Sequence, residues 1–175
     1  GREWTRGELL ASCNRIVHGL RALGLGKGDV VAAVLPNDAA IIELYLAVAQ
    51  AGMYLVPINW HLTAPEIAYI VQDSEAKVFV AHERFGDACK KAAAELEFAP
   101  ERRFAVGKID GFRPFAELSA GQPDTTPGDR AAGAGAAAAS GRSEASQSGI
   151  SLPTAGASAA AASAKGETPA AAKGE

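Results

Sequence analysis

Four short apolar runs alternate with longer segments of helical pattern in the first part of the chain. The run at residues 30–35 is apolar throughout, so it predicts a strand that is covered on both faces, as parallel strands are. The connections are long enough for crossovers and too long for hairpins. This order predicts an α/β fold, a mostly parallel sheet flanked by helices. The expected strands are residues 30–35, 54–58, 76–81 and 103–106, and the expected helices begin near residues 5, 38, 63 and 85.

The helix boundaries have local signals. Residues 5–8, Thr-Arg-Gly-Glu, and residues 63–66, Thr-Ala-Pro-Glu, each have the spacing of a capping box, in which Thr and Glu satisfy backbone N–H groups at a helix start. Gly24 suits the left-handed conformation that ends a helix, and Asn37 is the predicted N-cap of the next one.

Two of these elements are expected to be buried. The run 54–58 lies between Gly and Asn and suits a buried strand. The helix at residues 38–50 has almost no polar face, so we expect it to be covered on most sides. Residues 112–118 are expected to add one short helical turn.

The composition changes sharply along the chain. All eleven aromatic residues lie at or before Phe115, and from residue 131 onward the only large aliphatic residues are Ile150 and Leu152. Such a segment buries too little apolar surface to offset the entropy of ordering it. The sequence therefore predicts an N-terminal α/β subdomain at residues 1–118, a linker at 119–130 and a disordered Ala/Gly/Ser-rich tail at 131–175.

Charge and cysteine content exclude several classes of function. The net charge is −3 and no Lys/Arg cluster occurs, which argues against a nucleic-acid partner. Cys13 and Cys89 are far apart and have no CxxC or His-rich neighbours, so buried neutral thiols in a reducing cytoplasm are expected. No run reaches the length of a membrane span, and no signal-peptide pattern is present.

The isolated polar residues indicate structural roles. Residues 24–28, Gly-Leu-Gly-Lys-Gly, follow a helix and precede a strand, which is the reverse of the order that a phosphate cradle needs, so a turn is the better interpretation. His18, His61 and His82 lack metal-ligand spacing. His61 and Asn59 follow a predicted strand at the edge where open α/β sheets bind ligands, but a turn role is favoured for both. Trp60 is expected to pack ahead of the Thr63 cap.

Several segments, in this order and spacing, resemble the N-terminal part of the ATP-dependent acyl-CoA synthetases. This family belongs to the adenylate-forming superfamily with luciferases and peptide-synthetase adenylation domains, and the resemblance covers residues 4–130. The segments are Asn14-Arg15, residues 28–32, Leu35-Pro36-Asn37, residues 52–67 and residues 73–78. The matching positions are Asn14, Arg15, Gly28, Asp29, Pro36, Asn37, Gly52, Pro57, Asn59, Leu62, Thr63, Glu66 and Asp73, and all fit scaffold roles.

The resemblance implies a reaction and its cofactors. In this family a fatty or related carboxylic acid attacks Mg-ATP to give an acyl-adenylate, and the thiol of coenzyme A then displaces AMP. The family's phosphate-binding loop, rich in Ser, Thr and Gly and ending in Pro-Lys-Gly, should follow residues 122–130. Residues 133–144 lack its Thr pair and its Lys. We therefore expect an inactive ligase fragment with no catalytic, cofactor-binding or metal-ligating residue, followed by an unrelated or out-of-frame tail.

Two other classes share the alternating pattern. One is a non-catalytic α/β binding or regulatory module, which a sharp thermal transition of a stable monomer would favour over a severed fragment. The other is a flavodoxin-like or receiver domain, for which residues 35–38, Leu-Pro-Asn-Asp, offer only a weak match.

The change of composition near residue 130 generates the first prediction. If the tail is out of frame, the nucleotide sequence downstream of that codon encodes a Thr-rich phosphate loop in another frame. Sequencing the gene checks this, and three frames without such a loop would rule out an interrupted ligase gene.

Overall fold

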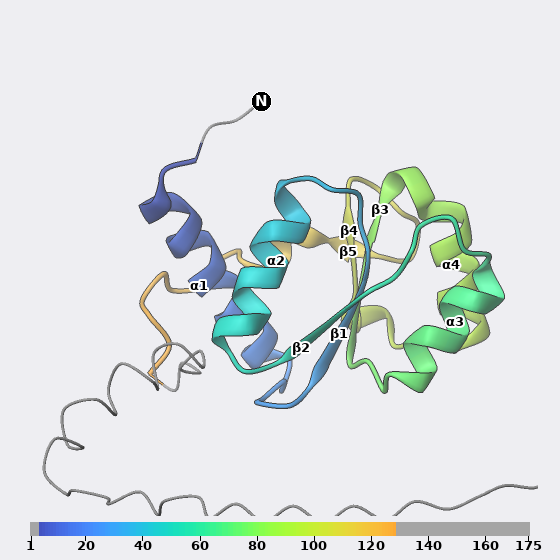
Figure 1. The fold of residues 1–175 in the computed structure, drawn as a ribbon, viewed down its shortest axis with the longest axis horizontal. Coiled ribbons are helices and arrows are strands. Elements are labelled where there is room, and N and C mark those ends of the chain that lie inside the picture. The colour runs from blue at the N-terminus through green and yellow to red at the C-terminus, as the bar shows by residue number, and fades with distance from the viewer. Residues whose placement is uncertain (1–3, 129–175) are drawn as a thin grey trace, which may run out of the picture. The chain divides into compact units, whose positions relative to one another are not determined.

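The computed structural model describes residues 4–128, which form one α/β unit (Figure 1). The tail predicted at 131–175 lies outside the described residues. The helices are α1 (Arg6–Ala22), α2 (Ala39–Gln50), α3 (Ala64–Asp73) and α4 (Gly86–Glu95). The strands are β1 (Val30–Val34), β2 (Tyr54–Pro57), β3 (Val78–His82), β4 (Arg103–Val106) and β5 (Arg113–Pro114), and three short 3₁₀ turns are Glu83–Phe85, Pro100–Arg102 and Phe115–Leu118.

The five strands form one sheet in the order β2-β1-β3-β4-β5, and every neighbouring pair is parallel. At its centre, Ala32 of β1 lies between Val56 of β2 and Phe79 of β3. The α/β fold with a parallel sheet is therefore confirmed. The two-residue β5 was not expected, because Arg113 and Pro114 carry no apolar run.

The helices cover both faces of the sheet. Helices α1 and α2 pack on one face, and α3 and α4 pack on the other (Figure 1). Strand β1 contributes to both layers of core, since Val31 and Ala33 point to the α1/α2 side while Ala32 and Val34 point to the α3/α4 side. This two-sided burial is why its sequence is apolar at every position.

The capping signals fold as predicted. The backbone N–H of Thr5 donates to Glu8 Oε2 at 2.8 Å, and that of Thr63 donates to Glu66 Oε2 at 2.7 Å. The hydrogen bonds from Thr63 hold the pKa of the Glu66 carboxyl below its usual value. Helix α1 ends at Ala22, and Gly24 has φ +83°, the left-handed conformation expected there.

Three expectations about the α2–β2 region are wrong. Strand β2 lies at the edge of the sheet, where Tyr54 is 64% exposed, because a short apolar run does not reveal whether a strand has one neighbour or two. The N-cap of α2 is Asp38 and not Asn37. Helix α2 is not covered on most sides, since Ile42 and Tyr45 are 52% and 57% exposed. Its fully buried apolar residues are Leu44, Ala47 and Val48, and Ala40 and Ile41 pack against the same core while partly exposed.

Helix α1 approaches the turn Phe115–Leu118 very closely at Gly19. A Cβ atom added to Gly19 would lie 1.8 Å from the carbonyl oxygen of Leu118, which is a backbone atom. Leu118 itself is buried in the same core layer as Leu20 of α1. A side chain at position 19 would therefore force the helix and the turn apart.

Gly19→Ala is expected to destabilise the chain by about 2 kcal/mol, as overpacking of a filled core does. Gly7→Ala in the same helix is the matched control, because nothing lies within 4 Å of a Cβ there. The control should be neutral or more stable by about 0.5 kcal/mol. Urea unfolding of the two variants measures the difference, and equal midpoints would contradict the close approach.

Candidate functional site

The loops at the carboxyl ends of the strands carry several polar side chains, among them Asp38, Asn59, Arg84 and Lys108. In this strand order the connections reverse direction between β1 and β3, because β2 is added on one side of β1 and β3 on the other. Open α/β sheets bind ligands in the crevice at such a reversal. The loops after β1, β2, β3 and β4 all meet at this edge.

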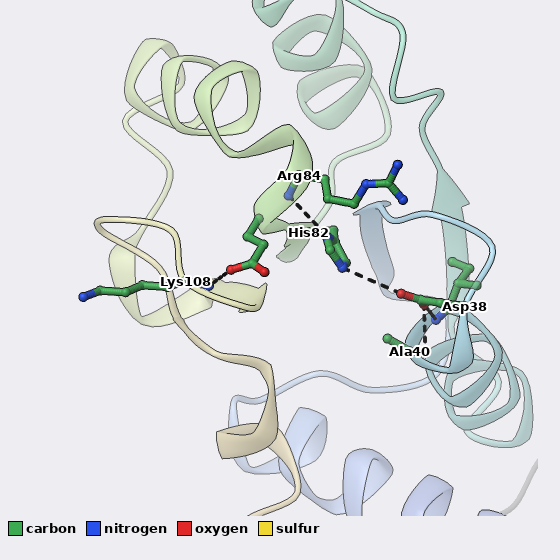
Figure 2. Close-up of polar contacts among 7 residues, drawn as sticks. Asp38, Ala40, His82, Arg84 and Lys108 are labelled. Carbon is green, nitrogen blue, oxygen red and sulfur yellow. Dashed lines mark hydrogen bonds and ion pairs between the residues drawn. The ribbon is translucent and has the colours of Figure 1, made fainter. Parts of the chain in front are cut away.

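Asp38 and His82 lie together at the reversal, as Figure 2 shows. Asp38 Oδ1 accepts from the backbone N–H groups of Ala40 and Ile41 at 3.0 and 3.4 Å, and its Oδ2 lies 3.8 Å from His82 Nε2. His82 Nδ1 accepts from the Arg84 N–H at 3.1 Å, so the ring proton sits on Nε2 and points toward the carboxylate. The pair links the start of α2 to the turn after β3.

The two sequence-predicted turn residues after β2 take the roles expected of a turn. Asn59 Oδ1 accepts from the backbone N–H of His61 at 3.0 Å. The His61 ring is exposed, with its centroid 3.4 Å from that of Trp60. Trp60 was expected to pack ahead of the next helix, and it stacks instead on Phe85, with ring centroids 5.1 Å apart and planes inclined by 15°.

A cavity of about 630 Å³ opens beside this aromatic pair. Its walls come from the β2 loop, the turn after β3, the first turns of α4 and the β4 loop. Its charged and aromatic lining residues are the rings Trp60 and Phe85, the cations Arg84, Lys90 and Lys108, and the carboxylates Glu83, Asp87 and Asp110. We call it the basic-aromatic pocket.

The charges of the basic-aromatic pocket are unequally paired. Lys90 Nζ lies 2.5 Å from Asp110 Oδ2 and holds the pKa of that carboxyl below its usual value. Glu83 Oε2 accepts from the Lys108 N–H at 2.9 Å. Across residues 4–128, the side-chain cations of Arg84 and Lys108 make no ion pair, and the Arg84 guanidinium lies 5.8 Å from the Phe85 ring centroid. The charge of Lys108 also lowers the pKa of the Asp110 carboxyl. Within residues 4–128, Arg84 is therefore the pocket cation with no carboxylate partner, and beside the stacked aromatic pair it suits an anionic ligand with a planar ring.

The remaining candidates are structural. Burial raises the pKa of the Cys13 thiol to about 11 and that of Cys89 to about 12, so both stay neutral and unreactive at pH 7. Both positions are buried, as the sequence indicates. Within the described part of the chain no group of three His, Cys, Asp or Glu side chains could hold a metal ion, and no helix is long and apolar enough to cross a membrane.

Sequence reasoning missed Asp38, Arg84 and Lys108. Each follows the end of a strand by only a few residues, so the signal was present in the strand assignments themselves. The strand order, which brings the loops after β3 and β4 side by side, was the missing information.

Comparison with known proteins gives consistent matches. The family profile described as "AMP-binding enzyme" matches residues 1–147. ScoC, a fatty acid–[acyl-carrier-protein] ligase of Streptomyces coeruleorubidus, is 37% identical over 127 residues, which cover 73% of this chain and 23% of ScoC. FadD13, a long-chain-fatty-acid–CoA ligase of Mycobacterium tuberculosis, is 41% identical over 76 residues, 43% of this chain and 15% of FadD13.

Solved structures agree with these matches. A crystal structure from Rhodopseudomonas palustris, described as a long-chain-fatty-acid CoA ligase, superposes with a TM-score of 0.65 at 32% identity. The superposition covers 73% of this chain and 32% of that protein. The matched residues span less than a quarter of the length of ScoC and of FadD13.

Proposed function

The chain belongs to the AMP-binding enzyme family, and on that premise we propose that it is the N-terminal part of a ligase that activates a fatty acid or a related carboxylic acid. The observation that carries the proposal is the 37% identity to a fatty-acid ligase over 73% of the chain. The proposed reaction of the whole enzyme joins the acid to AMP at the expense of ATP and then passes the acyl group to the thiol of coenzyme A. We expect it to occur in the cytoplasm.

We assign the basic-aromatic pocket to the adenosine phosphate part of a cofactor. A base can stack on the Trp60–Phe85 pair if it displaces the exposed His61 ring, whose centroid lies 3.4 Å from that of Trp60, since such stacking is worth about 1–3 kcal/mol for each base. Arg84 and Lys108 supply charge-assisted hydrogen bonds to phosphate. ATP and coenzyme A both carry this group, so the experiment must separate them.

The proposed reaction also implies a magnesium ion bound to ATP. Residues 4–128 contain no group of three His, Cys, Asp or Glu side chains that could hold it, and no step through the metal is derived for these residues.

Binding to the pocket is expected to change the fluorescence of Trp60. The chain has two tryptophans, so Trp4→Phe leaves Trp60 as the single reporter. Titration with ATP, and separately with coenzyme A, should quench Trp60 by stacking in at least one case. Arg84→Ala and Lys108→Ala should each weaken that binding about tenfold, because a hydrogen bond to a charged group is worth about 1.5 kcal/mol.

Lys91→Ala is the matched control, since Lys91 is exposed on α4 and does not line the pocket. It should leave binding unchanged. Equal losses in all three variants would indicate a general charge effect, and an unquenched Trp60 with both nucleotides would contradict the assignment.

The isolated chain is expected not to make acyl-adenylate, because residues 133–144 lack the Thr pair and the Lys of the family's phosphate loop. Fatty-acid-dependent exchange of pyrophosphate into ATP measures this reaction directly. No exchange above background is expected with fatty acids of any length. Exchange by the purified chain would refute the proposal of an inactive part.

A further inference from the structure

Residues 119–128, expected from composition to be a linker, lie against helix α1. Their sequence, Ser-Ala-Gly-Gln-Pro-Asp-Thr-Thr-Pro-Gly, has almost no apolar side chains, so hydrophobic burial cannot account for most of this contact. The contacts that hold the segment are polar and come from one face of α1. We call residues 122–128 the strap.

A buried polar chain connects the strap to both helices of this layer. Asn14 of α1 is only 2% exposed, and its Nδ2 donates to the backbone carbonyl of Asp124 at 2.7 Å. The amide of Gln50, at the end of α2, donates to Asn14 Oδ1 at 3.2 Å. Gln50 satisfies the oxygen of the Asn14 amide, and the strap supplies the acceptor for its nitrogen.

Two further side chains of α1 bind adjacent groups of the strap. Arg15 forms an ion pair with the Asp124 carboxylate at 2.8 Å, and His18 Nε2 lies 3.0 Å from the Thr125 carbonyl oxygen. Asn14 and His18 are four residues apart and so share a face of α1. They bind the consecutive carbonyl groups of Asp124 and Thr125, while Arg15 binds the Asp124 carboxylate.

The strap is fixed at both of its ends. On its N-terminal side, Leu118 packs against Gly19 at the close approach described above. On its C-terminal side, Pro127 is buried. The chain therefore leaves the described unit at a defined place beside α1.

We propose that Asn14, Arg15 and His18 form a latch that holds the strap against α1 and thereby fixes the position of Gly128 relative to the sheet. They act as positioning residues for the segment that follows. Their value to catalysis rests on the proposed function and concerns a full-length ligase, because the resemblance to acyl-CoA synthetases implies a phosphate-binding loop shortly after this point, whose Thr pair and Lys are missing from residues 133–144 of this chain. A loop that must hold reacting phosphates needs its starting point fixed closely, since misplacement by about 1 Å can cost a hundredfold in rate.

The latch can be tested by a distance measurement on the full chain. Spin labels placed at Gly128→Cys and Tyr69→Cys report the position of the strap end relative to α3, and both positions are exposed. The native thiols are buried and neutral, so labelling is selective. Pulsed electron resonance should give one narrow distance distribution for the labelled parent.

Variants then separate the latch from general stability. Asn14→Leu and Arg15→Asp should each broaden the distribution at least twofold, and Arg15→Asp combined with Asp124→Arg should restore it. Arg15 and Asp124 are both partly exposed, so changing either one removes no core packing. These variants therefore keep the latch testable if Asn14→Leu fails to fold. Arg6→Ala, an exposed cation on the same helix, is the control and should leave the distribution narrow.

A broad distribution in the parent, or a narrow one in Arg15→Asp, would overturn the latch. Failure of the charge swap to restore the narrow distribution would also overturn it. These outcomes do not depend on nucleotide binding. A narrow distribution in a chain whose Trp60 ignores nucleotides would leave the latch standing and remove only the proposed function.

Discussion

The structure depends on covering a parallel sheet on both faces. Strands β1 and β3 are buried between two helical layers, with Val31 and Val78 facing α1 and α2 while Ala32 and Phe79 face α3 and α4. A strand in this position has no solvent-facing side, which explains its continuous apolar sequence and fixes the helices as crossover connections. The polar groups are consequently displaced to the strand ends. That is why the Asp38–His82 pair and the basic-aromatic pocket both lie at the carboxyl edge.

The same constraint explains which parts of the fold could be predicted. Strand β4 was predicted with its observed limits, and β1 to within one residue, because an apolar run bounded by polar or turn residues is a local signal. The capping boxes at Thr5 and Thr63 are local as well. The exposure of Tyr54 and Tyr45 could not be predicted, since an apolar residue does not reveal whether another element of the fold covers it. How far an edge strand is exposed depends on the order of the strands in the sheet, which the sequence of a single segment does not encode.

The candidate site was less predictable for a related reason. Asp38 caps α2 and His82 ends β3, and the 3.8 Å contact that brings them together joins residues distant in sequence, although the hydrogen bonds of each side chain are local. Asn59 could be assigned correctly because its partner, the N–H of His61, is two residues away. The family resemblance did not help here, because its matching positions are scaffold positions. Arg84, Phe85 and Lys108 become a candidate site only when the β3 and β4 loops are seen to adjoin.

The strap shows how an apparently featureless segment can be ordered by a few polar contacts. Its composition predicts a linker, and composition is a sound guide only when order has to come from hydrophobic burial. Here order comes from the Asn14 amide, which is 2% exposed with the strap in place. Asn14 and Gln50 lie in the α1/α2 layer, and without the Asp124 carbonyl one buried donor of Asn14 would have no acceptor in place. Leaving such a group unsatisfied costs about 1–3 kcal/mol, which exceeds what the exposed Arg15–Asp124 pair contributes. Asn14 therefore contributes most of the free energy that holds the strap, whereas Arg15 makes the contact specific for the acidic side chain of Asp124.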